Sequence, residues 1–346
     1  LYRLGEQIVD SRDTVFVLAR PNNSDTCESI PKVEVYVNNW NDDADNLRLY
    51  LYVVPEASLQ KFEANHEILR IYSKNTAKTG HNVFNRIWLA DYVARKDNGQ
   101  VYEFEELAAS SGLGDDKGIK RLGVLRADVD NLGAIFAFGL SKTRSLSKYL
   151  TLSRLMETFF GYHLIHICEK VSEELISNIK ENTDNDNMFY INYAGGDDLV
   201  IIGPASGILL LAKEIDHSFH QYTNNKNLNI SGGITIISPS KPIRLGIKEA
   251  EENLSASKKV KGKHAITLLD RTIKLERYEN VLETVNVFKE YIDKKYISRT
   301  CFYNMMSILD VNNIDEYYHS IPLLMYSLKR NVVNEHIRCE LKKAIA

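Results

Sequence analysis

Hydrophobic and polar positions divide the chain into three regions. In the first region, short runs rich in Val, Leu and Tyr alternate with polar loops, a pattern typical of β-strands. The predicted strands cover residues 15–18, 32–37 and 47–54, with a polar loop at 41–46. Residues 92–95 and 101–104 flank Asn98-Gly99, a dipeptide that tolerates the positive φ of a hairpin turn. We therefore expect a β-rich or mixed domain over residues 1–117.

A glycine-rich polar linker at residues 110–118 separates this region from the next. Beyond the linker, short apolar strands alternate with amphipathic helices. The predicted strands cover 121–128, 188–193, 199–202, 229–237 and 265–269, and the predicted helices cover 146–179 with a break near Gly161, 208–222, and a third from Pro242 to 259.

The order β-α-β-β-α-β, with one extra helix and strand, is the ferredoxin-like split βαβ topology. We therefore predict an α+β fold, with this domain over residues 118–270. The remaining residues, 271–346, favour a helical C-terminal domain.

Composition and charge narrow the class of protein. The chain has 346 residues, and its 43 basic and 46 acidic side chains give a net charge of −3, which excludes a protein that coats nucleic acid through bulk charge. The longest aliphatic run, residues 208–212, is far shorter than the ~18 residues of a membrane helix. The sequence shows no stretch with the basic, apolar and small-residue pattern of a secretory leader, so we expect none. Because the chain begins with Leu1, we expect it to be a piece of a longer polypeptide.

The cysteines and histidines offer no evident zinc site. No C-x-x-C pair occurs, so we expect reduced thiols, a cytoplasmic location and no structural zinc. Two pairs of histidines are spaced three residues apart, but no third ligand is evident for either pair, so partly buried or surface histidines are expected. The residues concerned are Cys27, Cys168, Cys301 and Cys339, and the pairs His163/His166 and His217/His220.

The sharpest chemical feature is the turn Gly195-Gly196-Asp197-Asp198 between two predicted strands. Glycines permit a tight turn and close approach of a ligand. Two carboxylates ~4 Å apart repel by about 4 kcal/mol at an effective dielectric near 20, and a divalent cation removes that cost. The same triplet at residues 114–116 lies in the linker without flanking strands, so we interpret it as a plain turn.

A second acidic segment ends the first strand of the domain, at Asp128 and Asp130. In the split βαβ topology this strand is central and lies beside the hairpin, which brings Asp128 close to Asp197. Carboxylate oxygens favour Mg²⁺ or Mn²⁺, and two such ions can activate a sugar hydroxyl and stabilise leaving pyrophosphate. The amides of Asn131, Leu132 and Gly133 open the next helix and are candidates for holding a triphosphate.

Two weaker features complete the candidate site. Lysines at residues 258–263 close the last predicted helix and either contact phosphates or serve the helix dipole and solvation. Two glycines follow Ser231 within a strand, which indicates either close approach to a base or ribose or a simple bulge.

The segments LGVLRADVDNLG (residues 122–133) and YAGGDDLVIIGP (residues 193–204) together resemble the second palm domain of the large subunit of type III CRISPR interference complexes, of the Csm branch. ISGGITI (230–236) and KKVKGKHAITL (258–268) are similar to the family pattern as well. The resemblance covers roughly residues 122–269.

The resemblance implies a polymerase/cyclase-type palm that converts ATP into cyclic oligoadenylates when the complex binds target RNA. It implies Asp128, Asp197 and Asp198 as catalytic residues. The implied metal ligands are Asp128, Val129, Asp197 and Asp198. The implied nucleotide-binding residues are Asn131, Leu132, Gly133, Gly195, Gly196, Ser231, Lys259 and Lys263.

The resemblance also implies partners: other CRISPR effector subunits, guide RNA and target RNA, with no membrane. The family subunit carries an HD nuclease domain and a first palm domain, but no His-Asp dipeptide and only one palm are evident here. We therefore expect the fragment to lack DNA-cleaving activity. Two alternatives remain: a diguanylate-cyclase-like enzyme, although Asp198-Leu199 replaces the usual Glu-Phe, and a non-catalytic scaffold palm.

Overall fold

The computed structural model describes residues 14–20, 32–36, 48–55, 58–64, 66–74, 84–87, 90, 92–96, 99–110, 120–139, 145–178, 187–225, 227–309, 314–332 and 334–345. Its chain divides into two compact units, with the division between Thr272 and Ile273. The first unit contains two β-sheets, and the second is helical.

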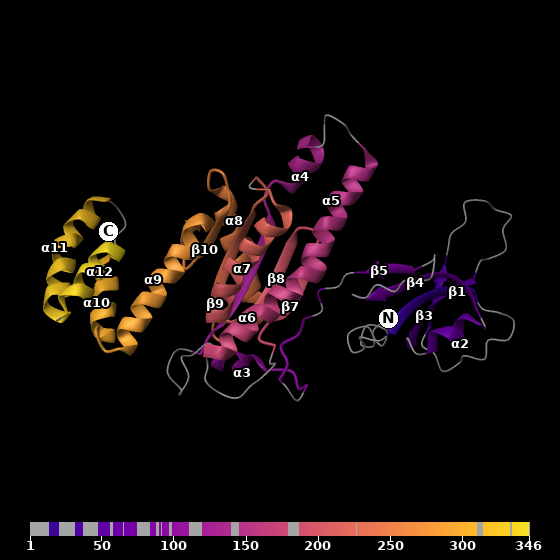
Figure 1. Cartoon of the computed structure of the whole chain (residues 1–346), viewed down its shortest axis with the longest axis horizontal. Coiled ribbons are helices and arrows are strands. Elements are labelled where there is room, and N and C mark those ends of the chain that lie inside the picture. Colours follow the sequence, from indigo (N-terminus) through magenta and orange to yellow (C-terminus); the bar gives the residue numbers. More distant parts are fainter. Residues whose placement is uncertain are drawn as a thin grey trace. The chain divides into compact units, whose positions relative to one another are not determined.

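The N-terminal sheet has five strands in the order β2-β3-β1-β4-β5 (Figure 1). Alternate residues of β1, such as Val15 and Val17, are buried together with Tyr52 of β3, as expected for a half-buried strand. The three strands predicted here are confirmed; the fourth and fifth were not predicted, and the loop at 41–46 lies outside the described residues. The elements are β1 (Thr14–Arg20), β2 (Lys32–Tyr36), β3 (Arg48–Pro55), α2 (Leu59–Glu63), β4 (Glu67–Lys74) and β5 (Phe84–Ile87).

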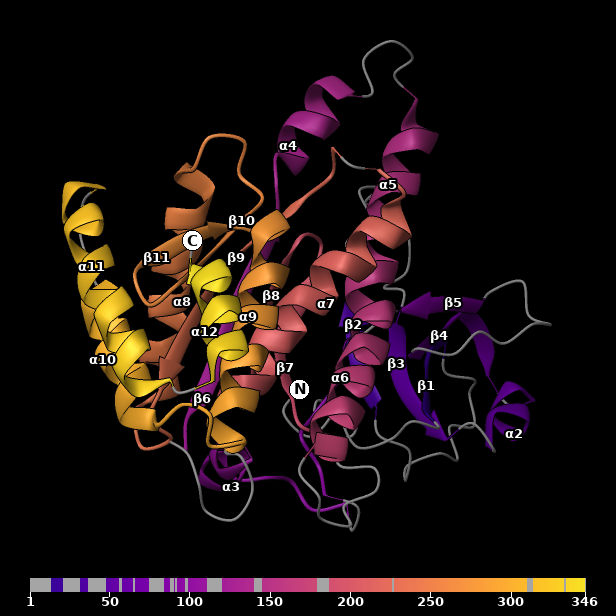
Figure 2. The same ribbon diagram turned by 60° about the vertical axis from the view of Figure 1, so that its left-hand side comes forward.

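The central sheet has six strands in the order β11-β10-β9-β6-β8-β7 (Figure 2). Its strands are β6 (Leu122–Val129), β7 (Tyr190–Gly195), β8 (Asp198–Pro204), β9 (Ile230–Ile237), β10 (Ala265–Leu268) and β11 (Arg271–Lys274). The helical segments are α4 (Leu132–Ala134), η2 (Ile135–Gly139), α5 (Leu146–Thr158), η4 (Phe159–His163), α6 (Leu164–Asn178), α7 (Ala205–Thr223) and α8 (Ile243–Lys259).

The connectivity confirms the ferredoxin-like prediction. The central strand β6 pairs antiparallel with β8 on one side and β9 on the other, and β8 pairs antiparallel with β7. The order β9-β6-β8-β7, linked through α6 and α7, is that of the split βαβ fold. The extra helix α8 leads to β10, which pairs parallel with β9.

Helices cover both faces of this sheet. A Cβ at Gly123 of β6 would lie 2.8 Å from Ile208 of α7. The next residue, Val124, lies 3.2 Å from the position of a Cβ at Gly246 of α8. Because successive residues of a strand point to opposite faces, α7 and α8 pack on opposite sides of β6.

The predicted long helix over residues 146–179 is interrupted near Gly161, as expected. The segment η4 makes π-helical turns between α5 and α6. Phe159 and Phe160 in this segment are fully buried, so the interruption turns two aromatic rings into the core of the central domain.

Residues 92–96 and 99–109 pack on the central domain, although the sequence assigns them to the preceding one. Tyr92 accepts a backbone hydrogen bond from Ile191 at 2.9 Å, and the Tyr190 hydroxyl donates to the Tyr102 carbonyl at 2.5 Å. The predicted hairpin turn closes with an antiparallel bridge between Arg95 and Val101, and Gly99 has a φ of 80°. All of the predicted linker except Ser110, with its Gly-Asp-Asp triplet, lies outside the described residues.

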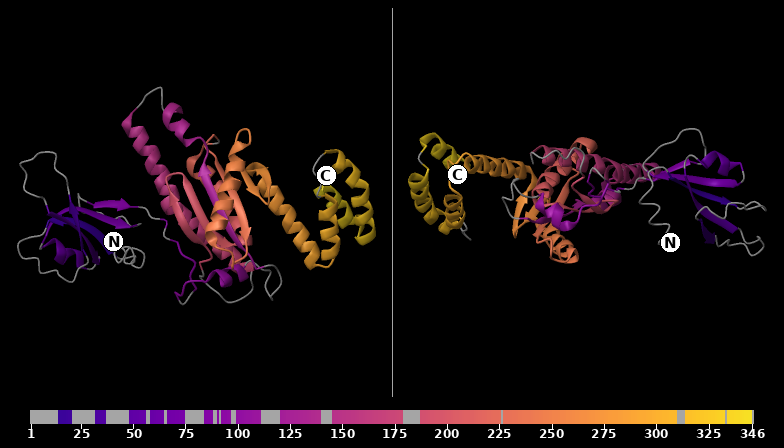
Figure 3. Two further views of the ribbon diagram at one scale, coloured as in Figure 1. Left: turned by 180° about the vertical axis from the view of Figure 1, so that it is seen from behind. Right: turned by 90° about the horizontal axis from the view of Figure 1, so that it is seen from below.

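The second unit confirms the prediction of a helical C-terminal region from residue 275 onward. Buried side chains including Leu324, Leu328 and Leu341 form its core. Figure 3 draws its helices in orange and yellow: α9 (Leu275–Asp293), α10 (Arg299–Leu309), α11 (Ile314–Asn331) and α12 (Glu335–Ile345). The prediction that helix begins at Arg271 is wrong, because residues 271–274 form the edge strand β11. Among the described residues, no helix has the length and hydropathy needed to span a bilayer.

Candidate active site

Two acidic strand ends meet at one end of the central sheet. Asp128 of β6 lies directly opposite Asp198 of β8 in the antiparallel register, and directly opposed side chains point to the same face. The Val129 main-chain N–H donates to the Asp197 carbonyl at 3.0 Å, which places the turn beside the end of β6. Three carboxylate-bearing residues therefore gather at this end of the sheet. Val129 is 2% exposed and its apolar side chain offers no ligand atom, so a metal contact through its main chain stays a prediction.

The turn that carries Asp197 depends on one glycine conformation. Gly196 has a φ of +67°, a region that L side chains rarely adopt. Gly195 pairs with Asp198 across the hairpin, so the chain reverses direction over Gly196 and Asp197 alone. A bulkier residue at 196 would open the turn and move Asp197.

Asp198 is held by an arginine two residues before Asp128 on β6. The Arg126 guanidinium lies 3.1 Å from Asp198 Oδ2 and 2.5 Å from Glu251 of α8, so both contacts lie on the α8 face. Burial raises the pKa of Asp198 above its usual value; Arg126 opposes this shift, and the negative charges of Glu251 and Asp197 reinforce it. The carboxylate is thus positioned at an electrostatic cost.

A lysine forms an ion pair with the carboxylate of Asp128. The Lys258 ammonium, in the last turn of α8, contacts Asp128 Oδ2, and each side chain is 25% exposed. Burial, with a smaller contribution from Lys263, lowers the pKa of Lys258 to about 8, and the Asp128 carboxylate acts in the opposite direction. A protein cation therefore sits where the sequence predicts a metal ion. Lys259, one of the two lysines predicted to contact phosphate, is exposed.

The donor set fits a divalent cation. Asp198 Oδ1 is buried and has no hydrogen-bond partner among the described residues, and leaving a buried acceptor unsatisfied costs about 1–3 kcal/mol. Around it, the negative charges of Asp197 and Glu251 add to that of Asp198. Carboxylate oxygens in this number suit Mg²⁺ or Mn²⁺. Asp128, Asp197 and Asp198 are the residues able to hold such an ion.

The segment after β6 forms the wall next to these carboxylates. Asn131 has a φ of 58°, which asparagine tolerates better than most residues, and α4 begins at Leu132. The Lys263 ammonium donates to Asn131 Oδ1 at 2.7 Å. The structure thus brings one of the two predicted phosphate-binding lysines to the loop predicted to hold the triphosphate. Gly133 is exposed, with open space where a Cβ would lie.

Asp130 and Ser231 hold the neighbouring loop in place. Asp130 is 3% exposed and Ser231 is fully buried. Asp130 Oδ2 accepts from the Ser231 hydroxyl at 2.7 Å and from the His264 main-chain N–H at 2.9 Å. Both side chains therefore connect β6 and β9 to the segment before β10. A nucleotide contact at Ser231 stays a prediction.

The second of the two glycines after Ser231 has a packing role. Strand β9 pairs with β6 without a register shift, so the bulge, one of the two alternatives drawn from the sequence, is wrong. A Cβ at Gly233 would lie 2.2 Å from Leu254 N and 2.3 Å from Ala250 O. The backbone of α8, rather than a base or ribose, fills the space that the missing side chain leaves.

Two residues of the site, Arg126 and Glu251, were missed from sequence, and Lys258 was a candidate for phosphate contact whose contact with Asp128 was not predicted. Arg126 and Asp128 share a face because they are two residues apart on a strand. Glu251 and Lys258 share a helix face because they are two turns apart. These spacings were visible in the sequence, but the face that α8 presents to β6 was not.

Residues 121–267 match the family model described as Cas10/Cmr2, second palm domain. Among curated proteins, the chain is 32% identical over 273 residues to the Cas10/Csm1 (subtype III-A) single-strand-specific deoxyribonuclease of Streptococcus thermophilus. The aligned region covers 75% of this chain and 32% of that protein. The Mycobacterium tuberculosis Cas10/Csm1 is 30% identical over 207 residues, or 58% of this chain and 24% of that protein. The chain spans about a third or less of these relatives.

Solved structures share the fold. A Csm1-Csm4 cassette in complex with pppApApA aligns with a TM-score of 0.61 at 23% identity, over 86% of this chain and 43% of that one. A Csm1-Csm4 cassette in complex with cA4 aligns with a TM-score of 0.59 at 24% identity, over 84% of this chain and 42% of that one. The two ligands, pppApApA and cA4, are bound by those related cassettes.

Proposed function

Because residues 121–267 belong to the Cas10/Cmr2 second palm domain family and the chain is a homologue of type III-A Cas10/Csm1 subunits, we propose that its palm joins ATP into cyclic oligoadenylates. The proposal includes a cytoplasmic CRISPR effector complex in which this chain meets other subunits, including one like the Csm4 of the related cassettes. Guide RNA and target RNA complete the proposed assembly, and target RNA activates the palm.

The proposal is carried by one observation: Asp128 and Asp198 oppose each other across β6 and β8, with Asp197 in the adjoining turn. In the proposed reaction a 3′-oxygen forms a bond to the α-phosphorus of ATP, the bond from that phosphorus to the β-phosphate oxygen breaks, and pyrophosphate leaves. A divalent ion held by these carboxylates would stabilise charge on the attacking and leaving oxygens.

The chain's own cations define the rest of the mechanism. Arg126 bridges Asp198 and Glu251 and so fixes one carboxylate before substrate arrives. Lys263 lies at Asn131, beside the loop proposed to hold the triphosphate. Without substrate, Lys258 neutralises Asp128. When substrate binds, we expect the ammonium to leave Asp128 and to form an ion pair with a phosphate oxygen.

The test replaces Asp197 and Asp198 with alanine in the full assembly, supplied with target RNA and labelled ATP. Loss of carboxylates that bind the metal should reduce oligoadenylate formation by about 100-fold or more. The matched control replaces Asp115 and Asp116, the other Gly-Asp-Asp carboxylates, and should keep full activity. Wild-type synthesis by the Asp197/Asp198 variant would refute the assignment.

Two further measurements separate the alternatives. Turnover of GTP in place of ATP would favour a diguanylate-cyclase-like enzyme. A scaffold palm would leave the melting temperature unchanged by ATP and Mg²⁺, whereas a ligand at 100 times its Kd should stabilise the fold by about 2.7 kcal/mol.

A further inference from the structure

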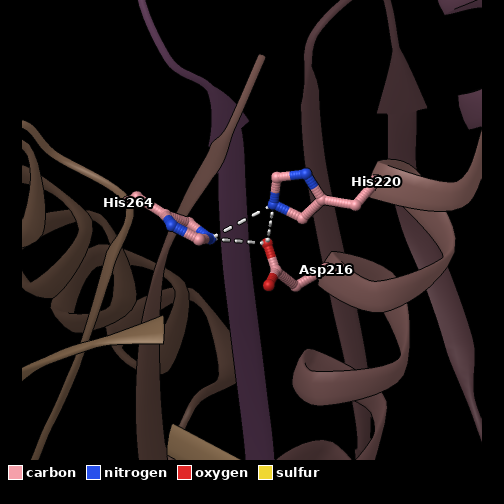
Figure 4. Close-up of side chains that lie close together, drawn as sticks. All are labelled: Asp216, His220 and His264. Carbon is pink, nitrogen blue, oxygen red and sulfur yellow. Dashed lines mark hydrogen bonds and ion pairs between the residues drawn. The ribbon is translucent and has the colours of Figure 1, made fainter. Parts of the chain in front are cut away.

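Three side chains of metal-ligating types meet on the α7 side of the central domain, two from α7 and one from beyond the following strand β9 and helix α8. Asp216 and His220 lie one turn apart on α7, and His264 comes from the segment before β10 (Figure 4). His264 Nε2 is 3.0 Å from Asp216 Oδ1, His220 Nε2 is 3.6 Å from the same oxygen, and the two Nε2 atoms are 3.5 Å apart. Three donor atoms thus form one compact triangle.

The size of this triangle suits a tetrahedral metal ion. Zinc binds imidazole nitrogen and carboxylate oxygen at ~2.0–2.2 Å, and in a regular tetrahedron such bonds separate neighbouring ligands by ~3.3–3.5 Å. The three observed separations of 3.0, 3.5 and 3.6 Å lie around that value. Two imidazoles and one carboxylate are an established zinc donor set that leaves a fourth position for water.

Hydrogen bonding accounts for the three contacts unevenly. The His264–Asp216 contact is a hydrogen bond at 3.0 Å, and the His220–His264 contact is a long one at 3.5 Å. The 3.6 Å from His220 to Asp216 is too long for one. We propose that Asp216, His220 and His264 bind a zinc ion. This site is distinct from the carboxylates on β6 and β8, and the proposal does not depend on the proposed function.

The cluster is accessible to an ion from solvent. The side chains of Asp216 and His220 are 17% and 28% exposed, and that of His264 is 11% exposed. A metal can therefore enter without opening the core, and the fourth coordination position can be held by water.

Zinc at this position would brace a strained loop. Gly262, Lys263 and His264 have φ values of 79°, 49° and 49°, and left-handed conformations of non-glycine residues persist only when their surroundings hold them. The His264 main chain also donates to Asp130, and Lys263 donates to Asn131. A metal bond to the His264 side chain would therefore position the loop that borders the candidate active site.

The test is zinc binding by the intact chain, purified and stripped of metal with a chelator. Titration calorimetry should give one zinc ion per chain, and Co²⁺ in its place should give the intense visible absorption of a four-coordinate site. The variants Asp216→Asn, His220→Gln and His264→Gln should each weaken zinc binding by roughly 100-fold or more. Circular dichroism verifies that each variant is folded, and His220→Gln, at the most exposed of the three positions, is the variant that tests the site with least effect on packing.

Two controls distinguish this site from others. His217→Gln, the neighbouring α7 histidine that contacts Gln221, should retain zinc binding. Asp197→Ala/Asp198→Ala should also retain it, so failure of the proposed function leaves this result intact. Zinc binding that persists in folded His220→Gln and Asp216→Asn, or no zinc bound by the wild-type chain at micromolar concentration, would overturn the proposal.

Discussion

The described part of the central domain contains two clusters of candidate metal ligands that differ in chemistry and in origin. The carboxylate cluster, Asp128, Asp197 and Asp198, contains only oxygen donors, with Arg126 and Lys258 as neutralising cations. The imidazole cluster, Asp216, His220 and His264, contains two nitrogens and one carboxylate, and lies against α7. The first suits a hard ion that exchanges with substrate, and the second suits a tightly held borderline ion. We therefore propose the first as a site for chemistry and the second as a site for positioning.

Lys258 of α8 contacts the carboxylate cluster, and His264 of the imidazole cluster lies in the segment that follows α8, so loosening the contact between α8 and β9 should disturb both clusters. Replacing Gly233 with alanine would place a Cβ within 2.3 Å of two backbone atoms of α8. Backbone cannot move aside cheaply, so we expect a loss of about 3 kcal/mol or more in unfolding free energy, measured by urea denaturation. Gly133→Ala, where a Cβ meets open space, should change stability by less than about 1 kcal/mol. Equal stability of the two variants would contradict this packing role.

Removing one carboxylate charge should separate the two clusters functionally. Asp128→Asn keeps the shape of the side chain but removes the charge opposite Asp198, so oligoadenylate synthesis in the full assembly should fall by about 100-fold. Zinc stoichiometry should stay at the wild-type value. Asp270→Asn, in an exposed turn with a φ of 59° that suits asparagine, serves as the matched control and should leave both unchanged. Loss of zinc in Asp128→Asn would show that the clusters are one site.

Asp130 connects the clusters, so its removal should affect both moderately. Alanine at this position deletes the acceptor shared by Ser231 and the His264 main chain. We expect roughly a 10-fold rise in the Kd for zinc and a rise in KM for ATP with a smaller change in kcat, since the loop would be less ordered. Ser231→Ala leaves the His264 contact in place and should have a weaker effect on both constants. An equal effect from both variants would argue against transmission through Asp130.

The smallest expected effect concerns the stability of the metal-free carboxylate cluster. Burial raises the pKa of Asp198, so its charged form is less favourable in the folded chain than in the unfolded one. Its contribution to stability is therefore greatest at low pH and is lost as the pH rises through the raised pKa. Asp198→Asn should remove this dependence and leave the neutral-pH stability within about 1 kcal/mol of wild type or slightly above it. Chemical denaturation between acidic and neutral pH checks this, and a large loss of stability at neutral pH would contradict it.

Local patterns predicted most of the central domain. Alternating apolar strands and amphipathic helices located β6 to β10 and α5 to α8, and Gly161 marked the interruption between α5 and α6. Patterns failed where an element was short and polar, as at β11, whose residues Arg271 to Lys274 are exposed or only partly buried. The reason for a glycine at position 233 was also misjudged. A glycine required by the close approach of a neighbouring helix has the same sequence pattern as one required by a ligand.

The sequence by itself determined the ferredoxin-like order of elements and the acidic strand ends, because strand periodicity and the Gly-Gly turn are local properties of consecutive residues. Only the tertiary structure decided which cations accompany those carboxylates and that His220, rather than His217, joins Asp216 and His264. Lys258 reaches Asp128 across 130 residues of sequence, and His264 reaches α7 across 44. Such contacts follow from how α7 and α8 pack on opposite faces of one sheet, and no short stretch of the chain encodes that packing.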